Sequence, residues 1–146
     1  MKILDIIPGK SIGKVELGMN RADAERLSDD VWYKNEYDED GLVNYIQIGY
    51  GTKDEYNCQY NGIDLFNTKA DDLVALLDKI SPYDRSHSEL GYTYAFPELG
   101  LTLWRSSIFT EEMRNEEWFK EMSKENQEDE MKYLYFESIA VFKVEH

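Results

Sequence analysis

The stretch VELGMNRAD, residues 15–23, decides the fold, because the stretch IDLFNTKAD, residues 63–71, repeats its pattern 48 residues later. Each reads as an apolar residue, an acid, a leucine, two spacers, a capping residue, a base, an alanine and an aspartate. Asn20 and Thr68 have side-chain oxygens that accept hydrogen bonds from the free N–H groups of a helix start. The final aspartate adds a carboxylate to the first helical turn. The sequence therefore predicts two short strands, each leading into a capped helix.

Apolar residues with helical spacing follow each cap. The first set is Ala22, Ala24 and Leu27, and the second is Leu73, Leu76, Leu77 and Ile80, on a longer helix that ends before Pro82. A repeat of this length predicts two related halves, about 13–60 and 61–105. A chance likeness between two capped helices is the alternative interpretation.

The remaining apolar segments are rich in β-branched and aromatic residues, as strands are. They predict strands over 43–48, 55–60, 92–96, 101–104 and 134–142. The pair Asn61-Gly62 is typical of a two-residue hairpin turn and connects 55–60 to a strand over 63–66. Together these elements predict one α+β domain over residues 1–146, an antiparallel sheet with capped helices packed on one face.

Residues 106–131 form an acidic insert before the last predicted strand. Met113, Trp118, Phe119 and Met122 permit one or two short amphipathic helices within it. The stretch 126–130 has no apolar residue, so it is predicted to be an exposed loop.

The net charge of −14 over 146 residues is concentrated in two segments. Residues 29–40 hold six acids and one base, and residues 111–130 hold nine acids and three bases, so the two segments carry 11 of the 14 net negative charges. This acidity argues against nucleic acid or an anionic membrane as a direct partner. The two segments are either solvated stretches or an anionic face for a cationic partner.

The sequence also indicates the compartment of the protein. No apolar run approaches the ~18 residues of a membrane span, and the N-terminus has no secretory signal pattern. The single cysteine, Cys58, rules out an intrachain disulfide and fits a reducing cytosol. We therefore expect a cytoplasmic protein without a membrane partner.

Catalytic motifs are poorly represented. One cysteine and two histidines, His87 and His146, cannot assemble a Cys/His zinc site, and neither a nucleophile elbow nor a phosphate-binding loop occurs. Carboxylates are abundant, so a small carboxylate-dependent hydrolase or a ligand-binding domain is the alternative function. We expect a protein that is not an enzyme and that uses no metal or cofactor.

The aromatic content favours a binding protein, because eleven tyrosines and three tryptophans exceed the needs of a small core. Trp32 and Tyr37 lie within the first acidic segment and Trp118 within the second. Each of these aromatic residues either contacts a partner or anchors its loop to the core. The candidate contact residues are Asp29, Asp30, Trp32, Glu36, Tyr37, Asp38, Glu39, Asp40, Glu112, Glu116, Glu117, Trp118 and Glu121.

Three stretches carry a family resemblance: IPGKSIGKVELGM (residues 7–19), YAFPELGLTLWR (94–105) and YFESI (135–139). They resemble immunity proteins of bacterial contact-dependent or polymorphic toxin systems. The capped unit is also similar to the repeats of β-lactamase-inhibitor-type folds. The resemblance implies a cytoplasmic protein that binds the C-terminal domain of one cognate toxin, often a nuclease, and blocks its active site. It transfers no binding residues, because immunity interfaces differ between toxin pairs.

Overall fold

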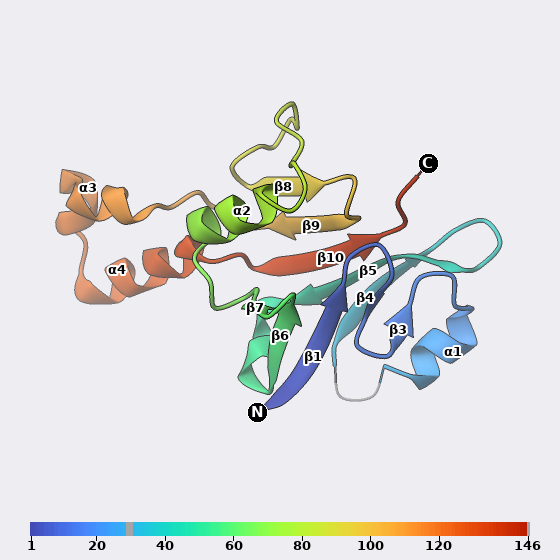
Figure 1. Cartoon of the computed structure of the whole chain (residues 1–146). Helices are drawn as coiled ribbons and strands as arrows, with labels where there is room; N and C mark the ends of the chain where they lie inside the picture. The colour runs from blue at the N-terminus through green and yellow to red at the C-terminus, as the bar shows by residue number, and fades with distance from the viewer. Residues whose placement is uncertain (29–30, 146) are drawn as a thin grey trace.

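The computed structural model describes residues 1–28 and 31–145 (Figure 1). Its strands form two five-stranded sheets, sheet 1 with the order β3-β2-β1-β6-β7 and sheet 2 with the order β4-β5-β10-β9-β8. The strands are β1 (Lys2–Ile7), β2 (Ser11–Ile12), β3 (Val15–Glu16), β4 (Tyr33–Tyr37), β5 (Val43–Gly49), β6 (Tyr56–Tyr60), β7 (Ile63–Asp64), β8 (Thr93–Phe96), β9 (Leu101–Trp104) and β10 (Ser138–Phe142). The helices are α1 (Arg21–Arg26), α2 (Ala70–Asp78), α3 (Glu117–Lys120) and α4 (Lys124–Met131), with 3-10 helices η1 (Tyr50–Asp54), η2 (Glu111–Asn115) and η3 (Lys132–Leu134).

The order hairpin, helix, hairpin occurs twice along the chain. Hairpin β2–β3 precedes α1 and hairpin β4–β5, and hairpin β6–β7 precedes α2 and hairpin β8–β9. The first hairpin of each set joins sheet 1 and the second joins sheet 2, while β1 and β10 are the middle strands. The α+β class is confirmed, although the strands divide between two sheets and β1 pairs with β6 in parallel. Common origin of the halves stays a prediction.

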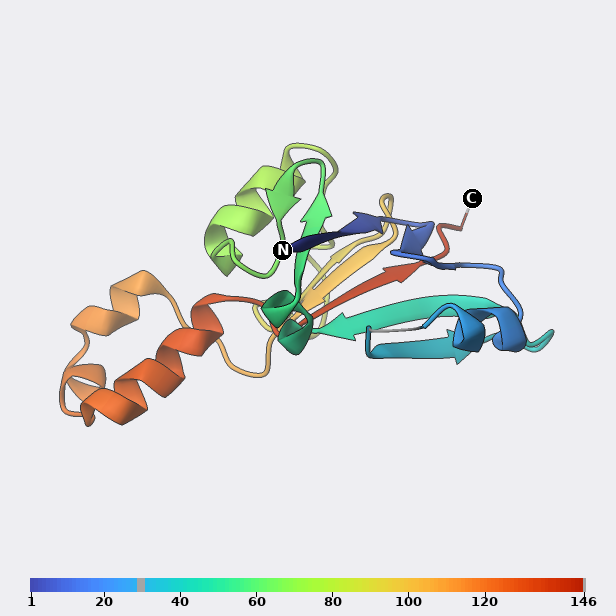
Figure 2. The same ribbon diagram turned by 90° about the horizontal axis from the view of Figure 1, so that it is seen from below.

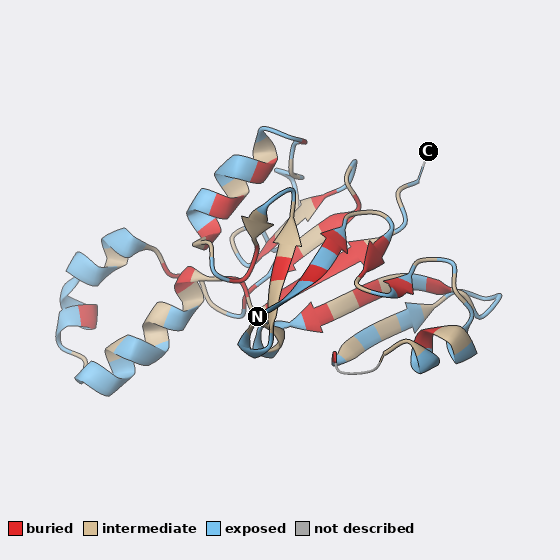
Figure 3. Ribbon diagram, turned by 60° about the horizontal axis from the view of Figure 1, so that its bottom comes forward, coloured by how far each residue is buried: buried red, intermediate tan, exposed pale blue. Residues whose placement is uncertain are grey.

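The main core lies between sheet 2 and the layer formed by sheet 1 and α2 (Figure 2). Sheet 2 contributes Ile46 and Ile48 of β5 and Ile139 and Val141 of β10, all essentially inaccessible to solvent. These residues alternate along their strands, so one face of sheet 2 is buried and the other face points away from the core. Figure 3 shows this burial along the strands.

The first helix start was predicted correctly and the second was not. Asn20 caps α1 by accepting a hydrogen bond from the Asp23 N–H at 2.8 Å. Thr68 does not cap α2, which begins at Ala70 and has Lys69 at its N-cap position. Thr68 lies one residue before that position, and its hydroxyl donates to the backbone oxygen of Asp64.

Part of the predicted apolar stripe on α2 is also wrong. Leu73 and Leu77 are fully buried, whereas Leu76 and Ile80 are 42% and 44% exposed. The helix ends at Asp78 and turns only one narrow face towards the core, so Leu76 lies beside that face and Ile80 beyond the helix.

Several strands and one hairpin turn were predicted correctly from local sequence. The predictions over 43–48 and 101–104 match β5 and β9, and Asn61 and Gly62 turn with positive φ angles of 53° and 78°. The last strand begins only at Ser138, because Leu134 belongs to η3.

The insert is more helical than the sequence suggested. The predicted loop over 126–130 is wrong, because these residues lie in α4. Ser123 caps this helix by accepting from the Asn126 N–H, and the Gln127 side chain donates to the backbone oxygen of Phe119 at 2.9 Å. Capping and the good helix propensity of Glu, Gln and Lys favour this helix, and Met131 at its end packs against the buried cluster of Phe109, Phe119 and Leu134. We call residues 106–135 the helical lobe.

Candidate interaction surface

A buried arginine holds the base of the helical lobe. Arg105 is 1% exposed, and its Nε donates to the backbone oxygen of Gly91 at 3.0 Å. Its Nη1 donates to the backbone oxygens of Phe109 and Tyr133, at 3.2 and 2.8 Å. Burial lowers the pKa of this guanidinium from its usual value. One side chain therefore ties the entry and the exit of the lobe to the loop before β8.

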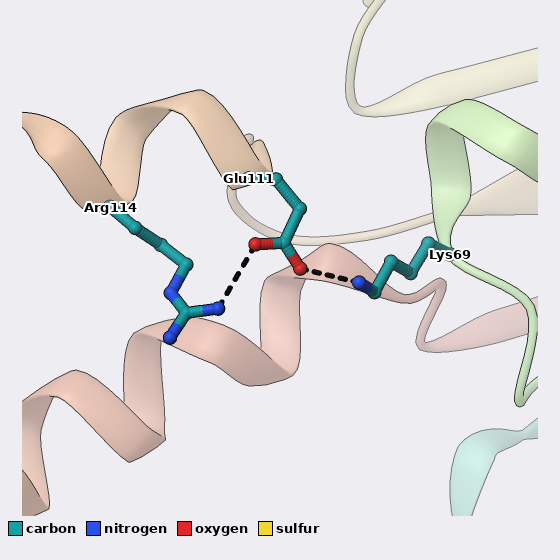
Figure 4. A network of polar contacts seen from close by, with 3 residues as sticks. All are labelled: Lys69, Glu111 and Arg114. Carbon is teal, nitrogen blue, oxygen red and sulfur yellow. Dashed lines mark hydrogen bonds and ion pairs between the residues drawn. The ribbon is translucent and has the colours of Figure 1, made fainter.

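An exposed ion-pair network joins the lobe to α2 (Figure 4). Glu111 in η2 accepts from Lys69, which precedes α2, and from Arg114 Nη1 at 3.1 Å. The hydrogen bond from Lys69, followed by that from Arg114, holds the pKa of the Glu111 carboxyl below its usual value. The stabilisation that Glu111 provides is therefore complete above about pH 4.5, and it is lost as the pH falls through the lowered pKa.

We expect Glu111→Gln to flatten the acid end of the stability profile. Between about pH 5 and pH 3, the variant should lose less of its free energy of unfolding than the wild type loses, as measured by urea unfolding at each pH. Glu112→Gln is the matched control, because Glu112 is exposed and has no ion pair with a described residue. Identical profiles for Glu111→Gln and the wild type would contradict the assignment.

Most acids of the lobe have no ionic partner. Glu111 and Asp129 form ion pairs, whereas the other acids have none among the described residues. These unpaired acids are Glu112, Glu116, Glu117, Glu121, Glu125, Glu128 and Glu130. Trp118 stands among them, 45% exposed, with its ring edge-to-face against Phe109 and Phe119. The lobe therefore presents both carboxylates without an ion pair and a part-exposed indole that packs against two phenylalanines.

The first acidic segment is divided between a hairpin tip and the strand before it. Glu39 and Asp40 are exposed at the tip of hairpin β4–β5, and Glu36 is exposed on β4. Trp32 is 88% exposed just before β4, whereas Tyr37 is half-buried beneath the Arg21 guanidinium, 4.0 Å from its ring centroid. The candidates Asp29 and Asp30 lie outside the described residues.

Asp38 has a structural role at this tip. Its Oδ1 accepts from the N–H groups of Asp40 and Leu42, at 2.9 and 3.0 Å. Such an aspartate shapes a turn through its side chain.

We expect Asp38→Ala to lower the free energy of unfolding by about 1 kcal/mol, because two N–H groups lose their acceptor. Asp38→Asn, which keeps an Oδ1 acceptor, should retain most of that stability, and Glu39→Ala should change nothing. Chemical denaturation distinguishes the three variants. Equal loss in Asp38→Ala and Asp38→Asn would assign the effect to charge instead of to the turn.

The two acidic segments do not meet. The hairpin tip between β4 and β5 and the helical lobe lie at opposite ends of the molecule in both ribbon views (Figures 1 and 2). The described residues therefore do not bring the candidates into one acidic cluster. Sheet 2 lies between these two ends.

The exposed side of sheet 2 was missed by sequence reasoning. Residues that alternate with the core residues along each strand point to this outer face: Lys34, Glu36, Tyr45, Gln47, Thr102, Trp104, Ser138, Ala140 and Phe142. The buried residues of α1, α2 and α3 belong to clusters that contain none of these residues, and α4 buries none of its own. Lys34, Glu36 and Trp104 are exposed on this face, whereas Ser138 and Ala140 of its middle strand are buried. The other four residues are half-buried. The alternation of small and apolar residues over 138–142 was the available signal.

Glu111 does not have the raised pKa of a general acid. A cleft of about 300 Å³ between α2 and the lobe is lined by Asp71, Asp72, Glu111 and Glu112, among others. A general acid needs a raised pKa, and the pKa of Glu111 is lowered. In the part of the chain that the structure describes, no group of three or more Asp, Glu, His or Cys side chains is arranged to hold a metal ion.

No described helix combines the length and apolarity that crossing a bilayer requires.

Comparison of the chain with protein-family models, curated proteins and solved structures gives no match.

Proposed function

We propose that this protein is a stoichiometric inhibitor that binds a basic protein domain and covers its active site. The observation that carries the proposal is the helical lobe, which combines seven carboxylates without ionic partners among the described residues with the exposed ring of Trp118. Unpaired carboxylates attract a cationic partner over a distance of about a Debye length, ~8 Å at physiological ionic strength. An exposed aromatic ring supplies short-range contact area.

The helix α4 supports this proposal because it buries none of its residues. Met131 at its C-terminal end packs against the buried cluster of Phe109, Phe119 and Leu134, whereas the other residues of the helix are polar. Glu125, Glu128 and Glu130 therefore remain available to a partner, while Gln127 and Arg105 keep the lobe in place. A surface that is already ordered loses less conformational entropy when it binds.

The nature of the partner follows from the resemblance to immunity proteins. A toxin domain that cleaves nucleic acid has a cationic substrate groove, which an acidic surface complements. Inhibition of this kind requires no covalent step. The proposed partner is therefore the C-terminal domain of a cognate toxin, and the proposed site of action is the cytoplasm.

Co-expression tests this function. The C-terminal domain encoded by a toxin gene next to the gene for this protein should stop bacterial growth when expressed alone, and co-expression of this protein should restore growth. The two proteins should also co-purify in a 1:1 ratio. Failure to restore growth together with failure to co-purify would contradict the proposal.

A further inference from the structure

Two tryptophans lie in one row across the outer face of sheet 2, beside the base of the lobe. Ser138 of β10 pairs with Gly49 on one side and with Trp104 on the other. Tyr33 pairs with Ile48, so the preceding residue, Trp32, lies next to Gly49 and has the same side-chain direction as Lys34. The row across the sheet is therefore Trp32, Gly49, Ser138 and Trp104.

We call these four residues the tryptophan row, whose two ends are more exposed than Ser138 within it. Trp32 and Trp104 are 88% and 38% exposed, whereas Ser138 between them is 8% exposed. Three strand spacings separate the two tryptophan positions, about 14 Å in all. A partner loop or extended segment that lies along the strands can therefore contact both tryptophans at once.

Acidic groups lie at both ends of the outer face of sheet 2. The lobe begins directly after Arg105, next to Trp104, and the hairpin tip with Glu39 and Asp40 lies at the other end of sheet 2 (Figure 1). Glu36 lies on the face itself, opposite Tyr45, whose pKa is raised by burial and then by the charge of Glu36. A segment that crosses this face therefore passes between two regions of negative charge.

The size of the face is consistent with a partner that also touches the acidic ends. Five strands about 4.8 Å apart and about five residues long cover roughly 400 Å². A standard protein interface covers about 800 Å² on each partner. The outer face supplies about half of that area, and the lobe and the tip are placed to supply the rest.

We propose that the outer face of sheet 2 is the central contact for the basic partner, and that a segment bearing arginine docks between Trp32 and Trp104. This inference rests on the proposed function. A guanidinium stacks on an indole face and keeps its N–H groups for nearby carboxylates, a combination that lysine makes less well. A second copy of this chain is the poorer occupant, because each copy carries a net charge of −14.

Trp32→Ala tests whether the tryptophan row binds the partner, and it leaves the core intact because the side chain is almost fully exposed. The dissociation constant for the toxin domain should rise about 30-fold, the usual effect of losing a hot-spot tryptophan. Thr102→Arg, which adds bulk and positive charge to the half-buried floor of the face, should weaken binding at least as much. Leu76→Ala is the control, because Leu76 is similarly exposed to Trp104 but lies on α2, on the other side of sheet 2.

Calorimetric titration separates the outcomes. Tight binding by the wild type and by Leu76→Ala, with weak binding by both face variants, supports the inference. Unchanged affinity in Trp32→Ala and Thr102→Arg would overturn the inference and leave the proposed function intact. No binding by the wild type would overturn both. Concentration-dependent dimers in light scattering that Trp32→Ala abolishes would assign the face to a second copy and overturn the inference.

Discussion

Replacement of Arg105 by methionine is expected to lower the free energy of unfolding by about 3–5 kcal/mol. Methionine fills a similar volume, so the effect isolates the lost polar contacts. The backbone oxygens of Gly91, Phe109 and Tyr133 would each lose a donor, in a buried setting at Phe109 and in a partly buried one at the other two. Each unsatisfied buried carbonyl costs about 1–3 kcal/mol, and relief of the buried guanidinium charge offsets part of that sum.

Urea unfolding of three variants checks this expectation. Arg105→Lys should also be strongly destabilised, because one ammonium cannot reproduce the fork that reaches carbonyls in three different segments. Arg114→Met, at an exposed arginine of the lobe, should stay within about 0.5 kcal/mol of the wild type. A loss below about 1 kcal/mol in Arg105→Met would mean that burial of the charge costs as much as its hydrogen bonds return.

Reversal of three lobe acids, Glu116, Glu117 and Glu121, to lysine is expected to slow association with the toxin domain by about tenfold to a hundredfold at low salt. These exposed carboxylates have no ion pair among the described residues. Their removal therefore changes long-range attraction without breaking an internal contact. The salt dependence of the association rate should also become shallower.

The matched control has the same change in net charge elsewhere. Reversal of Asp54, Glu55 and Glu98 alters three exposed acids outside both acidic segments, and it should slow association much less. Reversal of Glu39 and Asp40 measures the tip separately and leaves the turn-forming Asp38 intact. Stopped-flow rates at several salt concentrations report all three variants. Equal slowing by the lobe and control variants would assign the effect to total charge and not to the lobe.

Sequence reasoning succeeded where the signal was local. The Asn61-Gly62 turn, the Asn20 cap and the β5 segment each depend on residues close together in the chain. It failed where tertiary contacts decided the outcome. The parallel pairing of β1 with β6 joins residues more than fifty positions apart, and it divides the predicted sheet into two.

At the candidate surface, too, features set by local sequence can be separated from features set by tertiary contacts. The sequence left both an exposed contact and core anchoring open for Trp32, which is 88% exposed in the structure. The exposure of the lobe acids follows from the polarity of their segment. The contribution of Trp104 and Tyr45 was not predicted, because their direction depends on the register of β9 and β5 against β10. Asp38 was assigned to the partner, but its Oδ1 shapes the hairpin turn, a role that its spacing from Leu42 allows but does not reveal.

The central claim is that the acidic lobe and the outer face of sheet 2 hold one basic protein domain. The most direct test is calorimetric titration of this protein with the C-terminal domain of the toxin encoded beside it, from 50 mM to 500 mM salt. The account predicts a 1:1 complex that weakens steadily as salt increases, because opposite charges contribute to binding. The absence of a complex at 50 mM salt, or an affinity independent of salt, would contradict it.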